Sequence, residues 1–106
     1  MADDFIKYLT DLDSKTKSAD AEKNLDDWFM RPALTQLMSS QAYMGRDWPN
    51  LRKLARDLLD HNTATIELAT KHPDVFHHNI IRSRRSENRV HAEVIDRLDK
   101  LISQAR

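Results

Sequence analysis

The sequence predicts an all-α protein, a small bundle of four to six helices that are mostly antiparallel, in one domain spanning residues 1–106. Two observations lead to this prediction. The chain has one glycine and three prolines among its 106 residues, too few for the tight turns that a sheet protein of this size needs. Its apolar residues recur three and four positions apart between short polar breaks, which is the spacing of amphipathic helices joined by short connections.

Three helices are expected in the first part of the chain. The first has apolar residues at helical spacing: Phe5, Ile6, Leu9 and Leu12. The polar stretch "SKTKSAD" interrupts the pattern, and Ser18 or Asp20 can cap a second helix that runs to about Met30. A residue that precedes proline is pushed out of helical geometry. We therefore expect Pro32 to begin a third helix over residues 32–44.

The fourth helix has the strongest amphipathic pattern in the chain. Gly45 stands where a left-handed residue would end the third helix. Asp47 can cap the fourth, with Pro49 in its first turn. Its apolar stripe includes Leu51, Leu54, Ala55, Leu58 and Leu59. We expect Pro73 to end this helix.

The stretch from residue 74 to the end contains neither glycine nor proline, and two hypotheses stay open for it. In the first, which we favour, a short helix stops near Arg82 and Ser83 or Ser86 caps a new one, because serine and asparagine compete with helical hydrogen bonds. In the second, a single helix runs through. Its stripe would then be Phe76, Ile80, Ser83, Glu87, Val90, Val94, Leu98 and Leu101.

Composition narrows the function classes. The chain has no cysteine, which rules out disulfides, thiolate zinc sites and cysteine nucleophiles. Lys plus Arg equals Asp plus Glu at 17 each, so no overall field favours a nucleic acid or another charged partner. The acidic start does not resemble a secretory signal, and no segment has the apolar length of a membrane span. We expect a cytoplasmic protein without a membrane partner.

The histidines suggest a site but lack the spacing for one. Metal sites on helices need ligands three or four positions apart on one face, whereas His77 and His78 are adjacent and point about 100° apart. A histidine that accepts a phosphoryl group is usually followed by a lysine and a small residue, but neither lysine nor glycine follows His77 and His78 nearby. With one glycine there is neither a Gly-x-Ser-x-Gly turn nor a phosphate-binding loop. We expect no catalytic residue, no cofactor and no metal, and hence no enzyme.

Large apolar residues suggest a binding surface. Trp28, Phe29 and Met30 are consecutive, and three neighbours on a helix sweep about 200°, so one of them must approach the surface. Exposed Trp and Tyr are typical binding anchors, and Met adapts to varied partners. We assign partner binding to Trp28, Met30, Tyr43 and Trp48. The alternative is that these residues fill the corner where the second, third and fourth helices meet.

The charges are unevenly distributed along the chain. Residues 1–30 hold four lysines against eight acids, and residues 71–91 hold five Lys and Arg against two acids. Arg82, Arg85 and Arg89 are spaced to line one helix face, where they would bind phosphates or serve as a charged recognition face, with Arg84 flanking them. The alternative is that this basic face meets the acidic first helices of the same chain or of a second copy.

Taken together, these patterns predict a protein that binds another macromolecule and performs no catalysis. We expect a protein–protein interaction module, used as an adaptor, inhibitor or regulatory subunit, that self-associates as a homodimer. The second hypothesis is a nucleic-acid-associated regulator that places Arg82, Arg85 and Arg89 on phosphates.

Overall fold

The structure is a computed structural model that describes residues 2–18 and 24–104, and over these ranges it consists of helices without strands. Five helices follow one another: α1 (Ala2–Lys17), α2 (Leu25–Met38), α3 (Gln41–Met44), α4 (Trp48–Lys71) and α5 (Ile80–Gln104). The predicted all-α bundle is confirmed.

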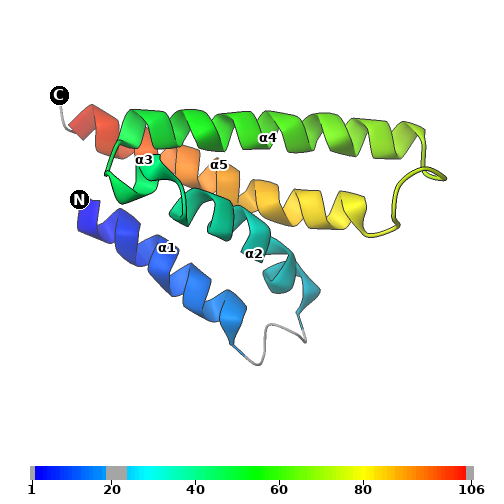
Figure 1. The fold of residues 1–106 in the computed structure, drawn as a ribbon, viewed down its shortest axis with the longest axis horizontal. Helices are drawn as coiled ribbons and strands as arrows, with labels where there is room; N and C mark the ends of the chain where they lie inside the picture. Colours follow the sequence, from blue (N-terminus) through cyan, green and yellow to red (C-terminus); the bar gives the residue numbers. More distant parts are fainter. Residues whose placement is uncertain (1, 19–23, 105–106) are drawn as a thin grey trace.

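The helices are arranged around α5. It packs against α4 on one side and α2 on the other, and α1 packs against α2 (Figure 1). Helices that follow one another along the chain are antiparallel, as α1 with α2 and α4 with α5, whereas α2 and α5 run in the same direction (Figure 1). None of the helices in the described part of the chain is long and apolar enough to span a membrane.

The core lies where α1, α2, α4 and α5 face one another. Its members are Phe5, Leu9, Ala33, Leu34, Leu37, Leu51, Ala55, Val90, Val94, Ile95 and Leu98. Helix α5 supplies the centre because its stripe at positions 87, 90, 94 and 98 is buried along its length.

The favoured break in the last part of the chain is wrong, because α5 is continuous from Ile80 to Gln104. The two serines that were expected to cap a new helix have other partners. The Ser83 hydroxyl donates to the carbonyl of Ile80 at 3.0 Å, and the Ser86 hydroxyl donates to Asp26 of α2 at 3.4 Å. These serines therefore do not compete with the helix, and the second hypothesis, one helix, is the correct one.

The predicted boundary at Pro32 is also wrong, since α2 continues through this proline to Met38. A proline inside a helix removes one hydrogen bond, here to the carbonyl of Trp28. Burial of the three following core residues, Ala33, Leu34 and Leu37, offsets that loss. The real break comes later, where the Ser40 hydroxyl accepts from the N–H of Tyr43 at 3.1 Å and caps α3.

The start of α2 differs from the prediction as well. Asn24 is its N-cap, and its side-chain oxygen accepts from the N–H of Asp26 at 3.2 Å. Ser18 instead donates its hydroxyl to the carbonyl of Lys15, at the end of α1. The alternative cap, Asp20, lies outside the described residues.

The left-handed residue between α3 and α4 is Arg46, with φ 56°, and not Gly45, with φ −89°. The N–H of Asp47 donates to the carbonyl of Ala42, and the N–H of Arg46 donates to the carbonyl of Tyr43. This pair of bonds is the Schellman motif, which places the left-handed residue one position after the cap. Gly45 is that cap, so the prediction was displaced by one residue.

The boundaries of α4 are as predicted. Asp47 caps its beginning by accepting from the N–H of Asn50, and Pro49 lies in the first turn. The helix ends at Lys71, just before Pro73. An ion pair between Arg52 and Asp99 joins α4 to the last turns of α5.

Candidate functional site

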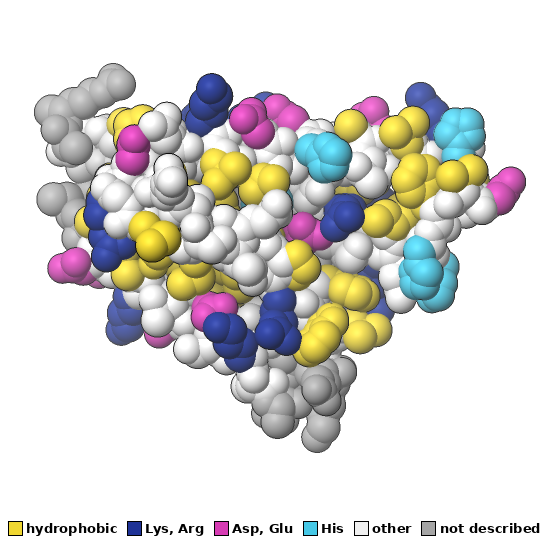
Figure 2. Space-filling view, in the orientation of Figure 1, with side chains coloured by type: hydrophobic (Ala, Val, Ile, Leu, Met, Phe, Trp, Pro, Cys, Tyr) yellow, Lys and Arg dark blue, Asp and Glu magenta, His cyan; other side chains and the backbone are white. Residues whose placement is uncertain are grey.

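The most distinctive surface feature is a groove of about 590 Å³ between the first part of α2 and the first part of α5. We call it the Trp28 groove, and its lining is Trp28, Phe29, Arg31, Pro32, Thr35, Gln36, Ser83, Arg84 and Glu87. Its size is within the range of about 300–1,000 Å³ that is usual for ligand pockets. Figure 2 shows hydrophobic and basic side chains close together at the lower right of this face, over the beginnings of α2 and α5.

Helical geometry explains why Trp28 reaches this groove. Consecutive helical residues point about 100° apart, so the run of three large apolar residues diverges. Met30 packs against the core and Phe29 is half-buried in the groove wall, whereas Trp28 keeps 42% of its surface exposed. The guanidinium carbon of Arg31 lies 4.8 Å from the centre of the Trp28 ring, a cation–π contact that holds the indole in place.

An ion pair forms the α5 wall of the groove. Arg84 donates to Glu87 at 2.6 Å, and only 4% of the Glu87 surface is exposed. The Nε of Arg84 is buried and has no hydrogen-bond partner within the described chain. Arg84 thus lines the Trp28 groove and is not among the residues around the hollow of the other three arginines.

Arg82, Arg85 and Arg89 lie together around a second hollow, of about 410 Å³. We call these three residues the arginine face. Their positions fall within about 60° on a helical wheel. The hollow is on the other side of the α2–α5 contact from the Trp28 groove, and His78 and Ile81 complete its edge.

Asp26 of α2 partly neutralises the arginine face. Arg82 donates to its carboxylate at 2.9 Å, and Arg89 lies 4.0 Å away. The hydrogen bond from Arg82, together with the charges of Arg82 and Arg89, holds the pKa of Asp26 below its usual value against the opposing effect of desolvation. The alternative that the basic face meets acidic residues of the same chain therefore applies to Arg82 and Arg89. Arg85 stays exposed.

The other proposed apolar anchors lie elsewhere. Tyr43 and Trp48 are half-buried and pack against the core at the α3–α4 corner. The Trp48 ring meets Phe5 edge to face at 5.4 Å, and Arg46 lies over the Tyr43 ring. Of the four anchors proposed from the sequence, Trp28 is exposed and lines the Trp28 groove, whereas Met30, Tyr43 and Trp48 are half-buried.

Four of the five histidines are exposed, namely His61, His72, His77 and His78. Histidine side chains are visible at the right-hand end of the molecule, beside the α4–α5 connection (Figure 2). The rings of His77 and His78 lie 4.2 Å apart. No group of three or more potential metal-binding side chains occurs among residues 2–18 and 24–104.

His91 differs from the other histidines because it is completely buried. Its Nδ1 lies 3.0 Å from the side-chain oxygen of Asn88, which also accepts from Asn62 of α4. An amide oxygen only accepts, so the ring donates from Nδ1, and the buried Nε2 carries its lone pair without a partner in the described structure. Burial lowers the pKa of His91 to about 4, so the ring is neutral at pH 7.

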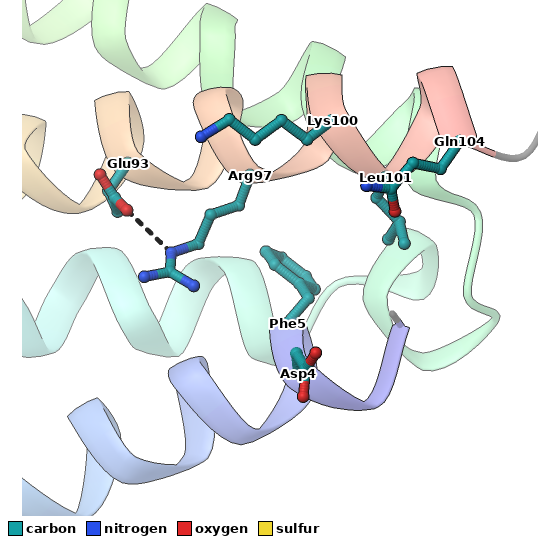
Figure 3. Close-up of a pocket in the computed structure, with 7 residues that line it drawn as sticks. All are labelled: Asp4, Phe5, Glu93, Arg97, Lys100, Leu101 and Gln104. Atoms are coloured by element: carbon teal, nitrogen blue, oxygen red, sulfur yellow. Dashed lines mark hydrogen bonds and ion pairs between the residues drawn. The ribbon is translucent and has the colours of Figure 1, made fainter.

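A third hollow, of about 300 Å³, lies between α1 and the end of α5 (Figure 3). Its charged side chains have partners within the protein. Arg97 donates to Glu93 at 2.8 Å and lies 4.0 Å from the centre of the Tyr8 ring, and Lys100 pairs with Asp96. The contact between Arg97 and Tyr8 joins α5 to α1, so we attribute a structural role to this hollow.

Comparison of the chain with protein-family models, with curated proteins and with solved structures gave no match. The functional argument therefore depends on the two hollows of the α2–α5 surface.

Proposed function

We propose that this protein is a non-catalytic protein–protein interaction module that binds its partner with the α2–α5 surface. The observation that supports the proposal is the Trp28 groove, in which an exposed tryptophan is held by Arg31 beside apolar walls. Trp and Arg are the residues that most often dominate binding energy at interfaces. The exposed arginine face, on the other side of the α2–α5 contact, supplies charge that attracts and orients a partner. Adaptor, inhibitor and regulatory subunit all fit this proposal, with the cytoplasm as its expected location.

Affinity capture with variants of the α2–α5 surface tests the proposal. Tagged wild-type protein and the Trp28→Ala variant are used as baits in an extract of the native host, and captured proteins are compared by mass spectrometry. Met44→Ala is the matched control, because Met44 is 70% exposed and lies in α3, away from the groove. We expect a protein that wild type and M44A retain, that W28A loses, and that binds again as a purified component. Equal capture by all three baits would contradict the proposal.

Self-association is a part of the proposal that needs its own test. Leu68 and Val75 are strongly exposed apolar residues near the α4–α5 connection, at the end of the molecule away from α3. A stable homodimer buries about 800 Å² on each partner, more than two side chains provide, so neighbouring surface would have to contribute. Light scattering over a dilution series measures the mass directly, and a monomer at the highest concentration would argue against a homodimer.

The second candidate function is nucleic-acid binding by the arginine face. It is favoured by the exposure of Arg82, Arg85 and Arg89 around one hollow. Contacts with phosphates release counterions, so the affinity must fall steeply as salt rises. A gel-shift titration over several salt concentrations checks this, and the absence of a shift at low salt would remove nucleic acid from consideration.

A further inference from the structure

We propose that the Trp28 groove binds an aromatic side chain together with a carboxylate, presented by a partner protein as Phe, Tyr or Trp one helical turn from Glu or Asp. This inference rests on the proposed function and names the chemistry of the partner segment. It follows from the charges on the two walls and from the aromatic and apolar side chains that α2 contributes to the lining.

The groove has a positive charge on each wall. Arg31 stands on the α2 wall and Arg84 on the α5 wall, and Glu87 is the only acid in the lining. Glu87 is already paired with Arg84 at 2.6 Å. Arg31 contacts the Trp28 ring and has no ion pair among the described residues. One positive charge is therefore uncompensated, and it favours an anionic group of the partner.

Arg84 presents a partly exposed guanidinium side chain to the groove. It keeps 33% of its side-chain surface exposed, whereas its Nε is enclosed and out of reach of a partner. Guanidinium groups match the geometry of carboxylates, which can accept two parallel hydrogen bonds. A carboxylate that enters beside Arg84 meets the charge of this guanidinium and that of Arg31 as well.

The apolar part of the groove suits a flat ring. Trp28, Phe29 and Pro32 all come from α2 and line its wall of the groove. The contact with Arg31 restricts the Trp28 indole, so little conformational entropy is lost when a partner ring packs against it. Aromatic pairs of this kind contribute beyond the area that they bury.

Two other occupants fit less well. A cationic side chain would meet two guanidiniums, and the carboxylate that could attract it is buried and paired. A polyanion such as nucleic acid gains more from the three arginines of the arginine face, which are on the other side of the α2–α5 contact. The partner segment we propose therefore combines acid and aromatic ring, not charge alone.

Titration of the full chain with peptides, monitored by two-dimensional ¹H–¹⁵N NMR, tests the inference. The probe is a blocked helical peptide with Glu and Phe four positions apart, a spacing that places them on one face. Two matched peptides replace Glu with Lys or Phe with Ala. The protein has two tryptophans, so Trp28 reports on the groove and Trp48, packed against Phe5, is an internal reference. We expect the Glu–Phe peptide to shift the Trp28 indole signal and leave that of Trp48 in place.

The affinity should depend on both features of the probe. We expect binding of the Lys–Phe peptide to be weaker by about two- to fivefold, within the range of exposed charge pairs, and the Glu–Ala peptide to lose the shift of Trp28. In the protein, Arg31→Gln should weaken binding of the Glu–Phe peptide by a similar factor. Lys53→Gln, an exposed change on α4, should have no effect.

Specific outcomes overturn the inference. Equal binding of the Glu and Lys peptides, tighter binding of the Lys peptide, or no shift of Trp28 with any probe would each contradict it. These results leave the proposed function intact if Trp28→Ala still abolishes capture of the protein partner. If W28A captures the partner normally, the proposed function itself fails.

Discussion

His91 gives a quantitative prediction, because a titratable ring is completely enclosed in the core. Burial lowers the pKa of His91 from an ordinary 6.5 to about 4. The unfolded chain therefore binds a proton in a pH range where the folded protein does not, and linkage requires the free energy of unfolding to fall as the pH falls through that range. The loss begins near the unfolded pKa and is complete below the folded one. The difference of the two pKa values corresponds to about 3 kcal/mol.

Urea unfolding at several pH values measures this loss. Other groups also titrate, so the contribution of His91 is taken as the difference between wild type and His91→Gln, which has no ionisable ring. We expect H91Q to have a lower free energy of unfolding than wild type at neutral pH. This difference in free energy should narrow by about 2.5 kcal/mol between pH 7.5 and 4.5. His78→Gln, at an exposed position, should follow wild type throughout. A gap between wild type and H91Q that is independent of pH would refute the reasoning.

A direct titration by NMR covers the case in which H91Q does not fold. The ring signals of His91 in the wild-type protein should stay those of the neutral Nδ1–H tautomer as the pH is lowered from 7.5 towards 5. Titration of His91 near its ordinary pKa would show that the ring is solvated, and would contradict the buried contact with Asn88.

Three further predictions concern stability. Leu34→Ala removes a completely buried side chain from the core and should lower the free energy of unfolding by about 2–5 kcal/mol, whereas Met44→Ala should change it by less than about 0.5 kcal/mol; urea titration compares the two. Arg46→Gly should raise the melting temperature because glycine removes the strain of the left-handed conformation, worth about 1–2 kcal/mol before the entropy of glycine is subtracted. Gly45→Ala should bring no such gain, since the added Cβ would lie 3.1 Å from a carbonyl oxygen one turn earlier. Asp26→Asn should destabilise the protein at neutral pH. The lowered pKa means that the carboxylate stabilises the fold above its unfolded pKa, so this difference should vanish as the pH falls through the folded pKa and should shrink in high salt.

The sequence predicted the fold class and most of the helical faces, because both follow from local spacing. It failed where a tertiary contact decides a local choice. Pro32 is a strong break signal, but burial of the residues that follow it keeps α2 intact. Ser83 and Ser86 favour a break until the partners of their hydroxyl groups are known, and one of these partners, Asp26, is 60 positions away from Ser86. No local pattern contains that information.

The candidate site shows the same limit. The exposure of one residue in the run of Trp28, Phe29 and Met30 follows from helical geometry alone. The Trp28 groove does not, because its walls come from helices about 50 positions apart. Glu87 lies on the stripe of the one-helix hypothesis, and its spacing of three from Arg84 could have indicated the ion pair. His91 follows Val90 on the buried side of α5, so acceptance of one continuous helix would have suggested that it is buried.

The two sides of the α2–α5 contact make the competing functions separable. The arginine face and the Trp28 groove share α5 but no lining residue, so each can be altered without the other. A polyanion needs the arginine face and is indifferent to Trp28, whereas an acidic aromatic segment needs Trp28 and Arg31 and responds less to Arg85, which lies in the other hollow. Because Asp26 already pairs with Arg82 and Arg89, a phosphate would have to compete with this carboxylate, while Arg31 has no ion pair with any acid of residues 2–18 and 24–104. This difference is the physical reason for preferring a protein partner to a nucleic acid.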